Sequence, residues 1–190
     1  MRNVLAILFA FVWLPAGAAE VAGVKIPETV QAANGNPLVL NGAGLRQRVF
    51  FKVYAMGLYF PRKTSVAADA IATGGAKRVA IHMLRDVDAA TFSGALADGI
   101  RANHSEADVK ALDARLSELT AIMAEMKEAK TGMRIELDWM PETGTVVRIN
   151  GAAHGKPIAG EDFYRALLRI WLGENPVQSD LKNALLGQTS

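Results

Sequence analysis

The stretch that most constrains the fold runs from Val49 to Phe60 and has the sequence VFFKVYAMGLYF. Aromatic and β-branched residues dominate it, which favours a β-strand. Successive side chains of a strand point to opposite faces, and here both sets are mainly apolar. We therefore expect this strand to be covered on both faces, in a sheet with protein packed on each side. Pro61 ends the strand.

The apolar pattern changes several times along the rest of the chain. It predicts short strands within residues 24–42 around an Asn34-Gly35 turn, a strand at 78–84, and an antiparallel hairpin of 133–140 and 145–150 with one solvent-exposed face. Helices are predicted at 66–72, at 89–101 after an Asp88 N-cap, from Ser105 to Gly132, at 161–172 with a left-handed Gly173 behind it, and at 180–186. The sequence thus predicts one α+β domain, an antiparallel sheet with helices layered on one face.

The first nineteen residues have the pattern of an export signal. A short basic start precedes an apolar run from Val4 to Leu14, and small residues follow Pro15. The run is shorter than the roughly 20 residues that a membrane-spanning helix needs. We expect residues 1–19 to be a Sec-type signal peptide and residues 20–190 to be a single exported domain without a membrane span, periplasmic in a Gram-negative source and otherwise secreted. A retained anchor or a buried helix is the alternative.

Composition and motifs exclude several classes of function. The net charge is +2 and no long Lys/Arg run is present, so nucleic acid is not an expected partner. There is no cysteine, which excludes disulfides, thiolate metal sites and thiol catalysis. No phosphate-binding loop, dinucleotide fingerprint, nucleophile elbow or zinc-protease motif occurs. We therefore predict no catalytic residue, no metal and no cofactor, and we expect His82 at the surface or at a sheet edge.

Two polar residues, Arg46 and Tyr54, lie in or beside apolar surroundings. A guanidinium is always charged and costly to bury, so one beside a doubly covered strand requires an anion, either a structural carboxylate or a ligand. A tyrosine hydroxyl in the same cavity can donate a second hydrogen bond. Alternatively, Arg46 points to solvent near a turn and Tyr54 only fills the core.

The segment Asn41-Gly42-Ala43-Gly44-Leu45-Arg46, followed by residues 52–59 (KVYAMGLY), resembles the start of the chalcone isomerase fold. Residues 172–182 are similar to the late helix and turn of that family, and the resemblance extends over roughly residues 22–187. It implies an open-faced β-sandwich with a layer of helices and a ligand cleft between sheet and helices. The chain resembles an exported bacterial branch of the family without catalytic activity.

The resemblance also implies where polar groups of the catalytic members would lie. Arg46 matches their arginine, whereas Tyr54 stands at the threonine position and Phe92 at the tyrosine position. Gly99 stands at the asparagine position and Ile170 at the late Ser/Thr position. Most of the groups that would stabilise developing charge are therefore replaced. An Arg–Tyr pair resembles the fatty-acid-binding branch, in which such a pair holds a carboxylate.

Arg46 and Tyr54 are eight residues apart, which on one extended strand is about 27 Å. They meet only if the chain reverses or bulges between them, and residues 47–53 contain no Gly or Pro. Arg48 and Lys52 are therefore alternative cations for the site.

The sequence predicts a cofactor-free protein that binds a small amphipathic acid, a fatty acid, through Arg46 and Tyr54. Two other functions stay open: a chalcone–flavanone-type isomerase (an intramolecular lyase), and a non-catalytic scaffold or interaction protein.

Overall fold

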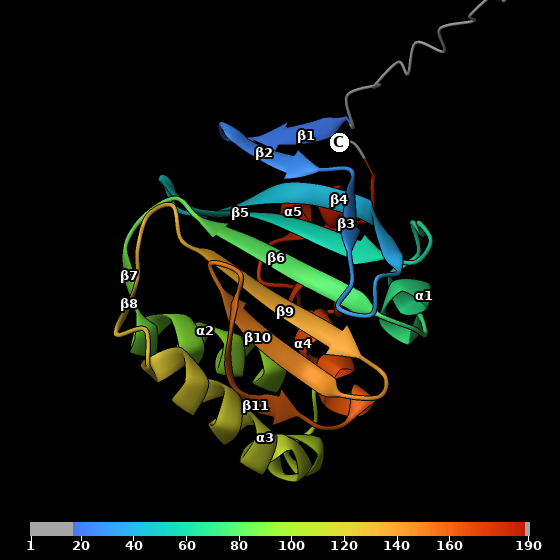
Figure 1. The fold of residues 1–190 in the computed structure, drawn as a ribbon. Helices are drawn as coiled ribbons and strands as arrows, with labels where there is room; N and C mark the ends of the chain where they lie inside the picture. Colours follow the sequence, from blue (N-terminus) through green and yellow to red (C-terminus); the bar gives the residue numbers. More distant parts are fainter. Residues whose placement is uncertain (1–16, 189–190) are drawn as a thin grey trace, which may run out of the picture.

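The computed structural model describes residues 17–188 as a curled antiparallel sheet with helices packed on its concave face (Figure 1). Seven strands follow the order β11-β10-β9-β6-β5-β4-β3. Their bounds are β3 Thr29–Gln31, β4 Pro37–Arg48, β5 Phe51–Phe60, β6 Lys77–Met83, β9 Arg134–Met140, β10 Gly144–Ile149 and β11 Ala152–Ile158. Two small sheets accompany it, formed by β1 Ala18–Val21 with β2 Val24–Pro27 and by β7 Val87–Asp88 with β8 Glu128–Ala129.

Within residues 17–188, five helices bury their apolar sides in one core against this sheet, as the sequence predicts. They are α1 Ala67–Ala72, α2 Ala89–Arg101, α3 Glu106–Ala124, α4 Glu161–Leu172 and α5 Ser179–Leu185. Both predicted N-caps are confirmed. The Asp88 carboxylate accepts the Thr91 N–H (2.8 Å) and the Ser105 hydroxyl accepts the Asp108 N–H (3.2 Å), which satisfies N–H groups that a helix start leaves free.

A second, smaller core lies on the other face of the sheet. The β1–β2 hairpin covers the β4–β5 part of that face, and Ile26, Leu40 and Tyr59 are buried between them. The Tyr59 hydroxyl donates to the Pro27 carbonyl (3.0 Å). Strand β5 is thus buried on both faces from Tyr54 onward, as expected. Of the predicted signal peptide, residues 1–16 lie outside the described residues, while Ala18 and Ala19 belong to β1.

The predicted strand at 49–60 is wrong at its start. Val49 and Phe50 form the turn of a long β4–β5 hairpin, and β4 is a twelve-residue strand rather than one of several short ones. Val49 adopts a left-handed φ of 57°, which is rare for a β-branched residue. Because turns of this kind favour Gly, Asn or Asp, apolar side chains at these positions concealed the reversal in the sequence.

Three helical and sheet details also differ from the prediction. Helix α3 ends at Ala124 rather than Gly132, because the chain turns through Lys127, at φ 59°, into β8. Gly173 is extended (φ −67°, ψ −174°), not left-handed, and a Cβ there would overlap the Asn103 side chain and the Arg169 carbonyl. Glycine is needed at this position because the neighbouring atoms leave no room for a Cβ atom. Strand β11 has no alternating apolar pattern, so the sequence did not indicate it.

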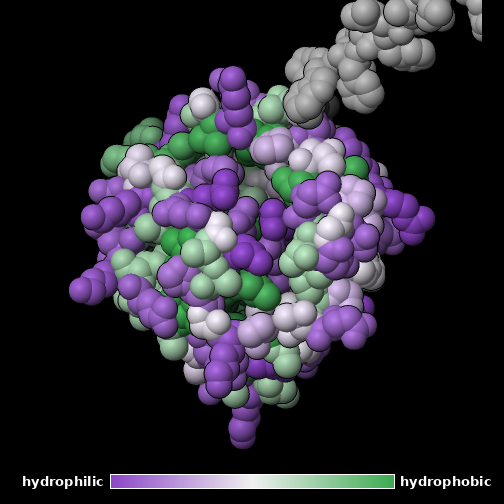
Figure 2. Space-filling model, viewed as in Figure 1, coloured by the Kyte–Doolittle hydropathy of each residue, from purple (hydrophilic) through white to green (hydrophobic). Residues whose placement is uncertain are grey.

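The β9–β10 hairpin has no solvent-exposed face of the predicted kind. Glu136 and Asp138 are buried, because guanidinium groups from neighbouring strands neutralise them. Arg78 Nη2 donates to Asp138 Oδ2 at 2.7 Å, and Arg148 Nε does so at 3.2 Å. Figure 2 looks onto the face of the sheet opposite the helices and shows hydrophilic side chains over the middle of that face. His82, expected at the surface or an edge, is half-buried on the central strand β6, and burial lowers its pKa.

Candidate functional site

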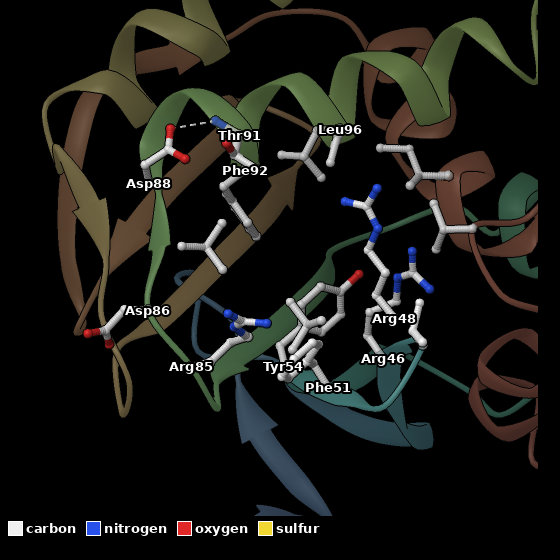
Figure 3. A pocket seen from close by; sticks show the side chains of 16 residues that line it. Arg46, Arg48, Phe51, Tyr54, Arg85, Asp86, Asp88, Thr91, Phe92 and Leu96 are labelled. Atoms are coloured by element: carbon white, nitrogen blue, oxygen red, sulfur yellow. Dashed lines mark hydrogen bonds between the residues drawn. The ribbon is translucent and has the colours of Figure 1, made fainter.

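A cavity of about 530 Å³ lies between the turn end of the β4–β5 hairpin and helices α2 and α4 (Figure 3). Its wall contains both residues that the sequence predicts for the site, Arg46 and Tyr54. Arg48 also lines it, whereas Lys52 does not. The remaining lining residues are Val49, Phe51, Val53, Arg85, Asp86, Val87, Asp88, Thr91, Phe92, Ala95, Leu96, Ile170 and Val177.

Arg46 and Tyr54 are directly opposite each other in the β4–β5 register. The reversal at residues 49–50 brings them together, and a bulge between Arg46 and Gln47 accommodates the local change of register. Opposed residues of an antiparallel pair share a face, so both side chains lie on the side of the sheet that carries the helices. The separation of about 27 Å that a single strand would impose therefore does not apply.

Gln178, just before α5, positions Arg46. Arg46 Nη1 donates to the Gln47 carbonyl (2.6 Å) and to Gln178 Oε1 (3.3 Å), and that same oxygen accepts the Gln47 N–H (2.9 Å). The Gln178 amide nitrogen donates to the Leu45 carbonyl (3.3 Å). The described residues offer Arg46 no carboxylate within ion-pair distance. Its charge is thus available to an anion in the cavity.

The Tyr54 hydroxyl is buried and oriented by α4. Trp171 Nε1 donates to it at 2.9 Å, which occupies one lone pair and leaves the hydroxyl hydrogen without an acceptor among residues 17–188. Burial raises the pKa of Tyr54, so this group is a neutral donor across the physiological range. In Figure 3 the hydroxyl points into the cavity that Arg46 and Arg48 also face, opposite Phe92 and Leu96 of α2.

The charges around the cavity leave a positive excess at its mouth. Arg46, Arg48 and Arg85 line it, and so do two aspartates. Both aspartates are already engaged: Asp86 accepts from the backbone and hydroxyl of Thr131 (2.7 Å each), and Asp88 caps α2. These hydrogen bonds lower the pKa of each carboxyl group and hold it away from a ligand. An anionic group is therefore the ligand end that this mouth favours.

The inner wall is apolar where the family resemblance would place polar groups. Phe92 and Ile170 both line the cavity. Gly99 does not, because its Cα lies against Ile170; a Cβ built there would be 2.7 Å from Ile170 Cγ2. The resemblance matches Phe92, Gly99 and Ile170 to the tyrosine, asparagine and Ser/Thr positions of catalytic relatives, and none of these three side chains offers a hydrogen-bond donor to the cavity. The cavity can hold an acid group at Arg46 and Tyr54 and an apolar chain beneath α2.

Sequence reasoning missed three residues of the site. Gln178 and Trp171 hold the pair in place, and Arg85 stacks on Phe51 with 4.6 Å from its guanidinium carbon to the ring centroid. All three belong to other segments of the chain than the β4–β5 hairpin. Their contacts with the hairpin depend on tertiary packing, which the periodicity of the sequence does not reveal.

Within residues 17–188, no cluster of three His, Cys, Asp or Glu could hold a metal ion, and no helix is long and apolar enough to cross a membrane.

Comparisons with known proteins agree with this fold. The family model described as chalcone isomerase-like matches residues 18–187. The chain belongs to the chalcone isomerase-like family. A crystal structure of a fatty-acid-binding protein from Arabidopsis thaliana is similar with a TM-score of 0.66 and 15% identity, over 86% of this chain and 92% of that one. At that identity the likeness establishes the fold. No curated protein sequence matches significantly.

Proposed function

We propose that this chalcone isomerase-like protein is an exported, non-catalytic and cofactor-free binder of a small amphipathic acid, namely a fatty acid. The supporting observation is the Arg46–Tyr54 pair, which presents a cation and a neutral hydroxyl donor to one apolar cavity. A carboxylate accepts two such bonds, and charge-assisted ones are the strongest. The cavity volume of about 530 Å³ is within the range of small-molecule sites. The name of the Arabidopsis structure fits the proposal.

Export rests on the signal-like pattern of residues 1–19 and is part of the proposal. A cell expressing the full chain should contain a processed form in its exported fraction. N-terminal sequencing of that form measures the cleavage site. A chain that keeps Met1 and stays with the cytosolic fraction would contradict export and leave the binding proposal intact.

A titration of the purified protein with a fluorescent fatty acid tests the binding. We expect saturable binding that Arg46→Ala weakens about 10-fold to 150-fold, the effect of one charged hydrogen bond. Arg62→Ala removes an exposed arginine elsewhere and is the matched control. Tyr54→Phe should also weaken binding, whereas Tyr59→Phe, on the other face of the sheet, should not. Equal affinity in Arg46→Ala and the wild type would remove Arg46 from the site.

A further inference from the structure

The tip of the β4–β5 hairpin is an exposed apolar surface at the mouth of the cavity. Val49 is 79% exposed, Phe50 91% and Phe51 59%, and these three residues are consecutive. The other large apolar residue with high exposure in the described chain is Val66, which stands alone before α1. We call residues 49–51 the apolar tip. Two phenylalanines in water at one turn are an unusual concentration of apolar surface for a domain of this size.

The backbone at the apolar tip is not what turn formation alone would select. Val49 adopts a left-handed φ of 57°, a conformation that disfavours β-branched side chains. Asn or Gly at such a position would relieve this strain and keep the turn polar. The sequence therefore retains apolar side chains where folding favours polar ones. This mismatch points to a role for the side chains outside the fold itself.

Cations surround the apolar tip. Arg46, Arg48 and Lys52 flank it in sequence, and Arg85 stacks on Phe51. No acidic residue occurs between Glu28 and Asp69, so the whole hairpin is free of negative charge. Of the two aspartates that line the cavity, Asp86 is bound to Thr131 and Asp88 caps α2. A protein partner of mixed charge gains little from such a surface, whereas an anionic lipid bilayer complements both the exposed rings and the cationic rim.

We propose that the apolar tip inserts into the interfacial region of an anionic lipid bilayer and brings the cavity mouth to the membrane surface. Val49 and Phe51 belong both to the tip and to the cavity wall, so insertion would open the cavity toward the bilayer. The purpose of this contact rests on the proposed function, because a fatty acid dissolved in the bilayer would enter the cavity without crossing water. The docking itself depends only on the tip and its cations.

The absence of cysteine allows a direct test with the full chain. A Phe50→Cys variant is labelled with an environment-sensitive fluorophore, and a Val66→Cys variant carries the same label at the other exposed apolar site. Both are mixed with vesicles of phosphatidylcholine, with or without phosphatidylglycerol. We expect the label at position 50 to shift to the blue with the anionic vesicles, an effect that fades as salt screens the charges, and the label at 66 to stay unchanged. Since both labels report local depth, any membrane contact of the first sixteen residues does not imitate this result.

Unlabelled variants measure how much the tip contributes. Phe50→Ser should weaken partitioning into anionic vesicles about tenfold or more, the effect of one apolar side chain removed from the membrane. Lys52→Gln should weaken it about fivefold, the contribution of one cation near an anionic surface. Val66→Ser and Lys156→Gln are the matched controls, with Lys156 on the opposite edge strand β11, and both should partition like the wild type.

Three results would overturn the proposal: no spectral shift at position 50, equal shifts at positions 50 and 66, or a shift at 50 that rises with protein concentration in the absence of vesicles. The last result would assign the tip to contact with a second copy of the chain.

The membrane contact and fatty-acid binding can be tested separately. Phe50 and Lys52 do not line the cavity, so the Phe50→Ser variant should bind fatty acid normally in vesicle-free buffer. If the wild type binds no fatty acid but the label at position 50 still shifts with anionic vesicles, the proposed function is refuted and the membrane-docking proposal stands.

Discussion

The indole N–H of Trp171 donates to the hydroxyl of Tyr54 across a buried distance of 2.9 Å. This bond joins the last turn of α4 to the centre of β5 and fixes the direction of the hydroxyl. It also uses one lone pair of the Tyr54 oxygen and not the hydroxyl hydrogen, so the same contact that orients the group leaves it free to donate to a ligand. One hydrogen bond thereby serves both the fold and the site.

Tyr54→Phe should therefore lower stability as well as binding. The substitution leaves a buried indole N–H without an acceptor, which costs about 1–3 kcal/mol. Denaturant unfolding of the ligand-free protein measures this loss. Tyr59→Phe also removes a hydroxyl, but its acceptor is the Pro27 carbonyl on the part-buried face, so we expect a smaller loss. Equal stability of Tyr54→Phe and the wild type would show that the Trp171 bond does not hold the site.

Gly99 and Ile170 should be energetically coupled, because a Cβ at residue 99 would meet Ile170 Cγ2 at 2.7 Å. Gly99→Ala gains about 1 kcal/mol of helix propensity, and we expect the clash to outweigh it. In the Ile170→Ala background the clash is absent and Gly99→Ala should stabilise. A double-mutant cycle on the free energy of unfolding measures this coupling. Additive effects of the two substitutions would contradict the packing of α2 on α4.

The Lys77–Glu161 ion pair should make stability depend on pH. Lys77 is buried, its Nζ lies 2.7 Å from Glu161 Oε1, and this bond lowers the pKa of Glu161 from its ordinary value of 4.5. A lowered pKa means that the stabilisation is complete above the ordinary value and is lost as the pH falls through the folded one. We expect Glu161→Gln to destabilise by about 1–3 kcal/mol near pH 7.

The difference between Glu161→Gln and the wild type should then shrink in acid, since the wild-type carboxyl group also becomes neutral. Urea unfolding at a series of pH values measures it. Glu118→Gln, an exposed position on α3, is the matched control and should follow the wild type throughout. A destabilisation by Glu161→Gln that stays constant down to low pH would show that charge does not underlie the effect.

Chalcone cyclisation should proceed at the rate of buffer alone. Phe92 and Ile170 contribute no donor to the developing charge, and Gly99 lies outside the cavity wall. We expect racemic flavanone from a chalcone incubated with the protein. Chiral chromatography of the product measures the enantiomeric excess. A persistent excess that Arg46→Ala abolishes would establish an isomerase and contradict the proposal of a non-catalytic protein.

Local patterns were sufficient to predict most of the architecture. The helices that contribute most to the core, α2 and α4, have apolar stripes, and their bounds agree with the prediction. Asp88 and Ser105 are capping residues that act within one turn, so they too are visible in sequence. The end of α3 and strand β11 were not predicted, because a left-handed Lys127 and pairing with β10 depend on tertiary contacts.

The site illustrates the same division between local and tertiary information. Arg46 and Tyr54 could be singled out as polar residues in apolar surroundings, and the structure places both in one cavity wall. Their pairing could not be derived, since the turn at Val49 and Phe50 carries neither Gly nor Asn. Gln178 approaches Arg46 from 132 residues away, a contact that no local pattern reports.

A comparison of a fatty acid with the fatty alcohol of the same chain length tests the central claim most directly. If Arg46 and Tyr54 hold a carboxylate, the wild type binds the acid more tightly, and Arg46→Ala loses affinity for the acid while its affinity for the alcohol is nearly unchanged. Competition against one fluorescent ligand measures all four affinities. Equal affinity of the wild type for acid and alcohol, or an equal loss of both in Arg46→Ala, would contradict the account.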